Sequence, residues 1–324
     1  MIYSFHGDSD SRKMDENNFH ELKTRPLKVL VVSQKGGVGK STLSANFSAY
    51  CGKMLKTKTL LLDCDPHASA SSWLKALKPE NVEIKHHLIN DFTAQRWYIG
   101  MRNVIRKNLQ GFDILVCDLT WTKSMSAEFV KEFDLIVIPT SVSLIEIDAT
   151  NIFIEENLER LAKTKNLPDL LICPSQVIGD ELKGNPFNAR TFKFPFLLLP
   201  PIPSDPQVRA MFEKGYAFET EDFIANSFKK VFRSILQAGR LRRERIGREE
   251  QISNNVSKGF GVSNNQGHAE ENVRSQQSNQ KQLHKLQKDN IMPLKNPNQL
   301  DKVKRLLGEK KKQKSSWIRR LVSW

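Results

Sequence analysis

The sequence SQKGGVGKST, residues 33–42, decides the fold of this 324-residue chain. It lies between an apolar run, residues 27–32, and a predicted helix that starts at Thr42. Glycines let backbone N–H groups turn toward an anion, and the positive end of a helix dipole favours the same ligand. A glycine-rich turn in this context therefore predicts a phosphate-binding loop.

Two residues of this loop have expected roles in a complex with a nucleotide polyphosphate. Lys40 is expected to neutralise the β- and γ-phosphates, and the Ser41 hydroxyl is expected to hold Mg²⁺. The general phosphate-loop pattern has glycine where this chain has Gln34, and it does not require the lysine at position 35. The loop is thus a variant of the general motif.

Short apolar runs alternate with longer amphipathic stretches between residues 26 and 239. The predicted strands are residues 27–32, 59–63, 113–117, 135–138, 170–173 and 196–199. The predicted helices are residues 42–55, 93–109, 127–133, 147–163, 206–214 and 221–236. Continuously apolar strands are typical of parallel sheets covered on both faces. We therefore expect a doubly wound α/β domain, a mostly parallel sheet with helices on both faces.

Two of these strands end in carboxylates. LLDCDPH, residues 61–67, places Asp63 and Asp65 on one side of a strand, and GFDILVCD, residues 111–118, ends at Asp118. Carboxylates near a phosphate loop suit Mg²⁺ coordination. The alternative for the first pair is a turn, which Asp-Pro often initiates. The adjacent His86-His87 pair lies in a polar stretch, for which we expect a solvated loop.

The segment KGGVGKST, with its second lysine at the start of the loop, resembles the deviant Walker A motif of the ParA/MinD family of dimerising ATPases. The resemblance covers residues 26–238 and is closest to small ParA-type partition ATPases with the P-loop NTPase fold. It implies that Lys35 reaches across a dimer to the partner's nucleotide. The residues implied to bind ATP are Lys35, Gly36, Gly37, Val38, Gly39, Lys40, Ser41 and Thr42.

The resemblance also assigns roles to the acidic segments. It implies that Asp65 orients the attacking water, so that the catalytic residues are Lys35, Lys40 and Asp65. The implied ligands of Mg²⁺ are Ser41, Asp63 and Asp118, the last of which ends a Walker B strand. The chain departs from the family at His67, where the family has glutamine. It also has LTWT, residues 119–122, in place of small residues, Pro or Gly, so we expect it either to hydrolyse ATP slowly or to couple nucleotide state to motion differently. Stimulation of hydrolysis by a partner is what the resemblance implies.

The net charge of +14 is concentrated near the C-terminus. Residues 240–324 hold 20 basic and 8 acidic side chains, whereas residues 1–239 are nearly neutral. We expect a disordered lead-in at 1–25, an ATPase domain at 26–239, a basic, polar, largely disordered tail at 240–309 and an amphipathic helix at 310–324. A basic excess of this kind favours contact with nucleic acid or anionic lipid.

Basic residues near the last predicted helix are candidates for non-specific DNA contact, which ParA-like ATPases make through the dimer. They lie off or beyond the apolar stripe of that helix, and they are Lys229, Lys230, Arg233, Arg240, Arg242, Arg243 and Arg245. Contact would be with phosphates rather than base edges. The alternative is a solvated helix end, where the helix dipole favours cations.

The last residues form a separate amphipathic segment. At helical spacing its apolar side chains share one arc, and they are Trp317, Ile318, Leu321, Val322 and Trp324. Tryptophans with flanking lysines suit a bilayer interface, and the segment resembles the membrane-targeting helix of MinD in position and type. Docking on a partner protein or on the chain's own domain are the alternatives.

These features predict an ATPase that dimerises on ATP, binds non-specific DNA and takes part in plasmid or chromosome partition. The resemblance implies a centromere-binding adaptor protein that stimulates hydrolysis, and a place in the cytoplasm on the nucleoid. The chain has neither an apolar leader nor a CxxC pair, which favours a reducing cytoplasm. One alternative is a MinD-like ATPase that cycles on the inner membrane, and another is a nucleotide-binding regulator with little turnover.

Overall fold

A computed structural model describes residues 25–88, 97–122, 125–158, 167–188, 192 and 194–259 of the chain, with side chains described as far as Gln251. The predicted lead-in, apart from Arg25, and the predicted C-terminal helix with its five apolar residues lie outside the described residues. So does most of the predicted polar tail.

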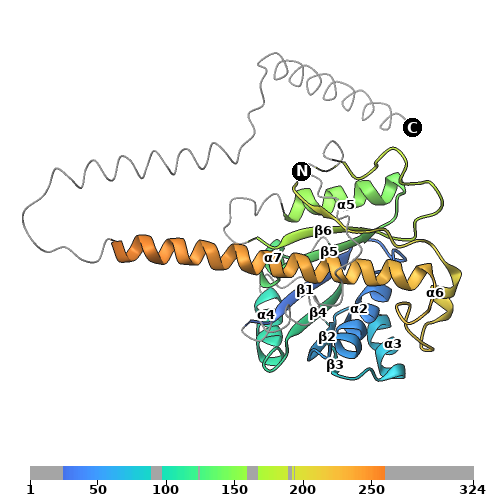
Figure 1. Ribbon diagram of the computed structural model, residues 1–324, viewed down its shortest axis with the longest axis horizontal. Coiled ribbons are helices and arrows are strands. Elements are labelled where there is room, and N and C mark those ends of the chain that lie inside the picture. The colour runs from blue at the N-terminus through green and yellow to red at the C-terminus, as the bar shows by residue number, and fades with distance from the viewer. Residues whose placement is uncertain are drawn as a thin grey trace, which may run out of the picture. The chain divides into compact units, whose positions relative to one another are not determined.

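The described chain forms a seven-stranded sheet in which all neighbouring strands pair in parallel (Figure 1). The strand order is β3-β2-β4-β1-β5-β6-β7. The strands are β1 (Leu27–Ser33), β2 (Thr59–Asp63), β3 (Val82–His86), β4 (Ile114–Thr120), β5 (Leu135–Thr140), β6 (Asp169–Pro174) and β7 (Leu197–Leu198). The predicted α/β fold with a parallel sheet is confirmed.

Helices cover both faces of this sheet. They are α2 (Lys40–Leu55), α3 (Ser69–Leu77), α4 (Trp97–Asn108), the 3₁₀ helix η2 (Ala127–Glu132), α5 (Leu144–Asn157), α6 (Pro206–Ala210) and α7 (Phe223–Gly259). One apolar core joins α2, α3 and α7 to one face of the sheet, and a second joins α4, η2 and α5 to the other. The central strands β1, β2, β4 and β5 are buried from both sides, which is why their sequences are largely apolar.

Two elements were not predicted. Strand β3 has the mixed sequence VEIKH and lies at the edge of the sheet, where none of its residues is buried, so its sequence lacks the continuous apolar run of the central strands. His86 ends this strand, and the expectation of a solvated loop is therefore wrong for that residue. Helix α3, with the sequence SASSWLKAL, has only nine residues, so its helical signal is short, although its buried residues Ala70, Trp73 and Leu74 do follow a helical spacing.

Helix α7 continues well beyond its predicted end at residue 236 and crosses the predicted domain boundary at 239. Ion pairs and a hydrogen bond hold its central part at the amino ends of β5 and β6. Arg242 donates to the Leu167 carbonyl and lies 3.4 Å from the Asp169 carboxylate, which also accepts from Arg245 at 2.7 Å. On the same edge, Asp134 pairs with Arg25 at 3.3 Å.

Arg242 is 4% exposed, although it belongs to the segment expected to form a disordered tail. Its burial lowers the pKa of the guanidinium, while Asp169 and Asp134 oppose that shift. The cation is thus held inside the domain by the carboxylates at the amino ends of two strands. A buried charge of this kind needs its partners in order to remain favourable.

Replacing Arg242 with Met should lower the free energy of unfolding by about 3 kcal/mol, because Asp169 and Asp134 lose a buried cation. Urea denaturation of the full chain at neutral pH measures the change. The matched control is Arg233→Met on the same helix, because Arg233 is exposed and its loss should have little effect. Equal stability of the two variants would contradict this account of α7.

Candidate nucleotide-binding site

The phosphate loop connects β1 to α2 and depends on two glycines in the left-handed region. Gly37 has φ +82° and Gly39 has φ +87°, values that L side chains rarely adopt. A Cβ at Gly39 would also lie 2.9 Å from the Ser175 hydroxyl. The Gly37 carbonyl accepts from the Gln176 side chain, so the segment after β6 supports the loop.

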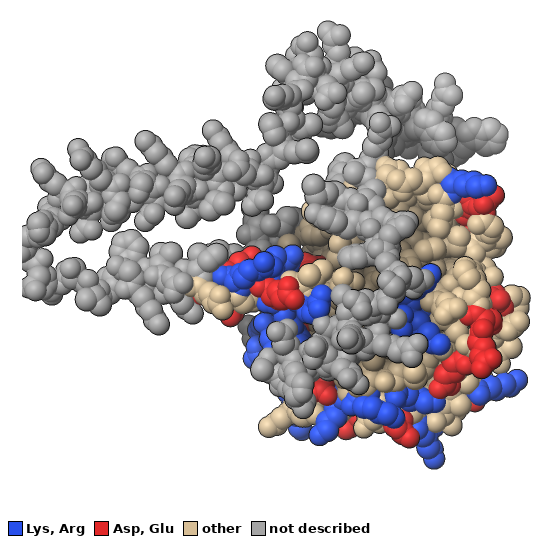
Figure 2. All heavy atoms as spheres, in the orientation of Figure 1, with Lys and Arg blue, Asp and Glu red and all other residues tan. Residues whose placement is uncertain are grey.

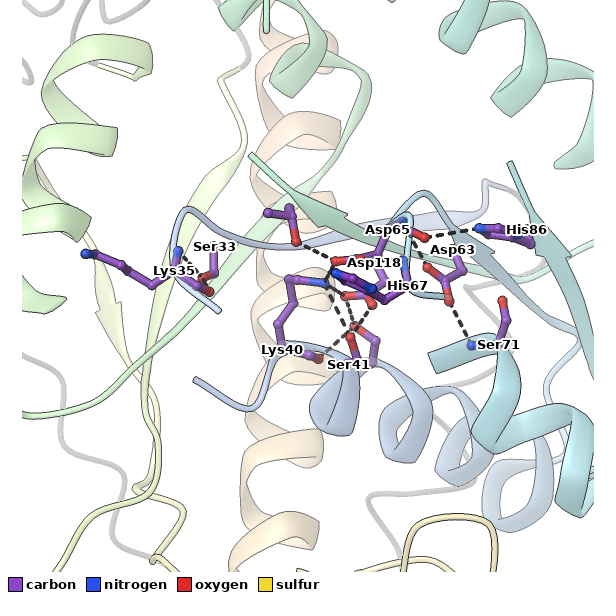
Figure 3. Close-up of polar contacts among 12 residues, drawn as sticks. Ser33, Lys35, Lys40, Ser41, Asp63, Asp65, His67, Ser71, His86 and Asp118 are labelled. Atoms are coloured by element: carbon purple, nitrogen blue, oxygen red, sulfur yellow. Dashed lines mark hydrogen bonds and ion pairs between the residues drawn. The ribbon is translucent and has the colours of Figure 1, made fainter. Parts of the chain in front are cut away.

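Asp118 lies at the centre of a buried polar cluster at the N-terminus of α2 (Figure 3). One carboxylate oxygen accepts from Lys40 Nζ and Ser44 Oγ, both at 3.0 Å, and the other accepts from Ser41 Oγ at 2.8 Å. Strand β4 is the neighbour of β1, which places its end beside the loop that follows β1. The predicted proximity of Asp118 to Lys40 and Ser41 agrees with this geometry.

Asp65 shares the same lysine. Lys40 Nζ lies 2.9 Å from Asp65 Oδ2, and the Thr120 hydroxyl donates to that same oxygen. The His67 backbone N–H donates to Oδ1 at 3.0 Å. Lys40 is therefore buried between Asp118 of β4 and Asp65 of the segment that follows β2.

The electrostatics of the cluster keep Lys40 charged. Burial lowers its pKa, but Asp118 and Asp65 outweigh that effect and the net pKa is raised. Burial raises the pKa of Asp65, yet the hydrogen bonds from Thr120, Lys40 and the His67 backbone bring it to about 2. Burial raises the pKa of Asp118 above its ordinary value despite the nearby Lys40. Asp65 and Asp118 thus form ion pairs with Lys40, a cation to which a polyphosphate could also bind.

Asp63 does not join this cluster. Its two carboxylate oxygens accept from the backbone N–H groups of Asp65 at 3.0 Å and Ser71 at 2.8 Å. These bonds fix the turn between β2 and α3. Both carboxylate oxygens of Asp63 are thus engaged by backbone amides, and the place of Asp63 in the Mg²⁺ shell stays a prediction.

Ser41 and Asp118 fit Mg²⁺, because they bring a hydroxyl and a carboxylate oxygen within 2.8 Å of each other. Among the described residues, no group of three or more His, Cys, Asp or Glu side chains could hold a metal ion. The ion would therefore need further oxygen ligands, which phosphates supply.

Lys35 is exposed, and Figure 3 shows its side chain pointing away from Lys40. The backbone N–H of Lys35 does not contact the cluster either, because it donates to the Ser33 hydroxyl at 3.0 Å. The loop thus presents one lysine to its own acids and the other to solvent.

Several contacts at the site were missed from the sequence. Ser44 follows Ser41 by one helical turn, and Thr120 follows Asp118 by two residues on the same strand, so spacing alone could have indicated both. His86 Nε2 lies 3.1 Å from the Asp65 carbonyl, a contact hidden by the missed strand β3. Nothing in the sequence places Ser175 and Gln176 beside the loop.

Residues 29–282 match the model of the CobQ/CobB/MinD/ParA nucleotide-binding domain. The chain belongs to this family. The resemblance to ParA/MinD ATPases that the loop sequence predicts is thereby confirmed.

Individual relatives agree with this membership. The chain is 40% identical over 53 residues, 16% of its length, to the chromosome-partitioning ATPase Soj of Thermus thermophilus, of which the match covers 21%. It spans less than a third of the length of the curated relatives it matches.

Two solved structures share the fold at 16% identity. One is the MinC:MinD cell division complex of Aquifex aeolicus, with a TM-score of 0.51 and coverage of 65% of this chain and 96% of that one. The other is a putative plasmid partition protein of Borrelia burgdorferi bound to AMPPNP, with a TM-score of 0.50 and coverage of 66% and 99%.

The predicted DNA-contacting residues of this family member are in different environments. Lys230 and Arg233 are exposed and Lys229 is half-buried, whereas Arg242 is buried and is not available to DNA. Arg245 pairs with Asp169, Arg243 donates to the Arg25 carbonyl, and Arg240 lies 3.6 Å from Glu244. On the face drawn in Figure 2, Lys and Arg side chains lie beside Asp and Glu. The predicted arginine cluster is thus largely engaged within the domain.

Lys40→Met in nucleotide-free protein should lower the free energy of unfolding by about 3 kcal/mol at pH 7, because two carboxylates lose their buried cation. In the wild type, the low pKa of Asp65, about 2 against an ordinary 3.8, stabilises the fold above pH 4 and this contribution is lost as pH falls toward 2. In the variant that pKa rises. Because the wild-type contribution is lost over that range, the two stability curves should converge as the pH is lowered from about 4 toward 2.

Urea denaturation across that pH range measures this convergence. The control is Lys53→Met on the same helix, whose partner Glu219 is at the surface, so its effect should stay below about 1 kcal/mol. A Lys40→Met penalty that stays constant with pH would show that the cost does not come from Asp65 and Asp118.

Proposed function

We propose that this chain is a ParA-type ATPase that dimerises on ATP, binds DNA non-specifically and takes part in plasmid or chromosome partition. The observation that carries the proposal is the buried Lys40, shared by Asp65 and Asp118 beside Ser41 at a phosphate loop. Such an arrangement suits a site that exchanges internal carboxylates for a polyphosphate. The names of Soj and of the Borrelia partition protein support the role in partition.

In this mechanism Lys40 leaves Asp65 and neutralises the β- and γ-phosphates of ATP. Ser41 and Asp118 would hold Mg²⁺, which when bound neutralises charge that develops on the phosphates. Asp65, released from Lys40, orients the water that attacks the γ-phosphate. Backbone N–H groups of the loop and the dipole of α2 hold the phosphates in place.

Lys35 acts on the nucleotide of a second copy. Its exposure and its direction away from Lys40 support a role outside its own site. A lysine supplied in this way stabilises transition-state charge, as an arginine finger does.

Lys35→Ala should therefore retain ATP binding and lose ATP-dependent dimers, with turnover at least about 100-fold lower. Light scattering with ATP and phosphate release measure the two effects. The control is Lys53→Ala, which removes a lysine of α2 that lies outside the loop and should behave as the wild type. A Lys35→Ala protein that still dimerises and turns over ATP would contradict the role in trans.

DNA binding in the ATP-bound dimer would involve exposed cations such as Lys230 and Arg233, and a centromere-binding adaptor would stimulate hydrolysis and release. Retention on a DNA column with ATP and Mg²⁺ tests this switch. The wild type should be retained, and the retention volume of Lys40→Ala should be at least about 10-fold smaller at the same salt concentration. Equal retention of the two proteins would count against an ATP-dependent switch.

The runner-up is a MinD-like ATPase that cycles on a membrane, which the amphipathic sequence at 310–324 favours. The helices among the described residues include none long and apolar enough to cross a membrane. Sedimentation with anionic liposomes, with and without residues 310–324, separates the two functions. Loss of ATP-dependent sedimentation on truncation would support the membrane role, and unchanged sedimentation would remove it.

A third function, a regulator with little turnover, would follow from the bulky residues at 119–122. Phosphate release in the presence of DNA and adaptor decides this point, because brisk turnover excludes such a regulator.

A further inference from the structure

The carboxylate of Asp65 has an unusual donor set. Oδ2 accepts from Lys40 Nζ at 2.9 Å and also from the Thr120 hydroxyl, while Oδ1 accepts from the His67 backbone. Three structural elements therefore hold one carboxylate. If Lys40 turns to a phosphate, Asp65 loses that one contact and can keep those with Thr120 and the His67 backbone.

The position of Thr120 is fixed by its strand. It is the last residue of β4, pairs in register with Ser33 of β1, and lies two residues after Asp118, on the same side of the strand. The intervening Leu119 is fully buried in the opposite core. The backbone N–H of Trp121 donates to the Ser33 carbonyl at 2.9 Å, and this bond holds the end of β4 beside β1.

The main chain at Asp65 is held from the other side. His86, at the end of β3, places Nε2 at 3.1 Å from the Asp65 carbonyl. Thr120 and His86 thus approach the segment after β2 from the two strands that flank it. Because His86 on β3 holds the backbone of Asp65, the Thr120 hydroxyl on β4 can set the direction of the Asp65 side chain.

We infer that Thr120 is a positioning residue, whose hydroxyl keeps the Asp65 carboxylate aimed at the attacking water once Lys40 has turned to the phosphates. The inference rests on the proposed ATPase function and assigns a part in it to a residue of the LTWT segment, residues 119–122. It gives a function to one of the bulky residues at 119–122, where the family pattern has small ones. Thr120 acts through Asp65 and does not itself need to touch ATP.

Matched substitutions separate the hydroxyl from the shape of the side chain. Thr120→Val keeps the branched shape and removes the donor, whereas Thr120→Ser keeps the donor and removes a methyl group. Thr120→Val should lower kcat by about 10- to 100-fold, as expected for loss of a hydrogen bond to a charged group, with ATP affinity changed by less than about 3-fold. Thr120→Ser should restore kcat to within about 3-fold of the wild type.

The measurements are steady-state phosphate release and binding of a fluorescent ATP analogue, using the full chain with Mg²⁺, DNA and adaptor. Thr59→Val is the control, because Thr59 is a buried threonine at the opposite end of β2 whose hydroxyl contacts only the Thr57 region. Melting temperatures monitor folding. If Thr120→Val does not fold, Thr120→Ala replaces it, with rescue by Thr120→Ser as the criterion.

The outcomes are distinguishable. Wild-type turnover that needs Lys40, lost in Thr120→Val and restored in Thr120→Ser, supports the inference. Unchanged or faster turnover in Thr120→Val, or equal losses in the Val and Ser variants, overturns it while leaving the ATPase function intact. A wild type that releases no phosphate overturns the proposed function, and this inference with it.

Discussion

The structure depends on one buried cation. Lys40 follows directly from the phosphate loop, and its ammonium group lies between Asp65 and Asp118 with only 7% of the residue exposed. An isolated charge in that position would be strongly unfavourable, so the ends of β2 and β4 must bring their carboxylates to it. This requirement connects the loop, helix α2 and the ends of two strands through one set of ion pairs.

The topology satisfies that requirement. In the order β2-β4-β1, the strand that ends near Asp118 lies between the strand that leads to Asp65 and the strand that leads into the loop. Because all three are parallel, their carboxyl ends share one edge of the sheet. Asp63 pairs in register with Asp118, yet its oxygens are taken by backbone amides. Identical residue types at one sheet edge thus acquire different roles through their local hydrogen bonds.

Much of this could be predicted because the signals are local. The buried strands are continuous apolar runs, and the loop has a fixed spacing of glycines and lysines, so six strands, Lys40 and Asp118 follow from the sequence. The rest depends on contacts between distant segments. Strand β3 owes its conformation to pairing at an edge, and Thr120 contacts Asp65 in the segment after a different strand. Arg242 is buried where Asp134 and Asp169 meet α7.

The fastening of α7 has a consequence for polyelectrolyte behaviour. Binding of a protein to DNA weakens with salt in proportion to the number of phosphates that its cations neutralise, because each contact releases condensed counterions. Arg242 and Arg245 already neutralise Asp169 within the domain. A duplex lying along this helix would therefore release fewer counterions than the count of basic residues suggests, and the salt dependence of its binding would be correspondingly shallow.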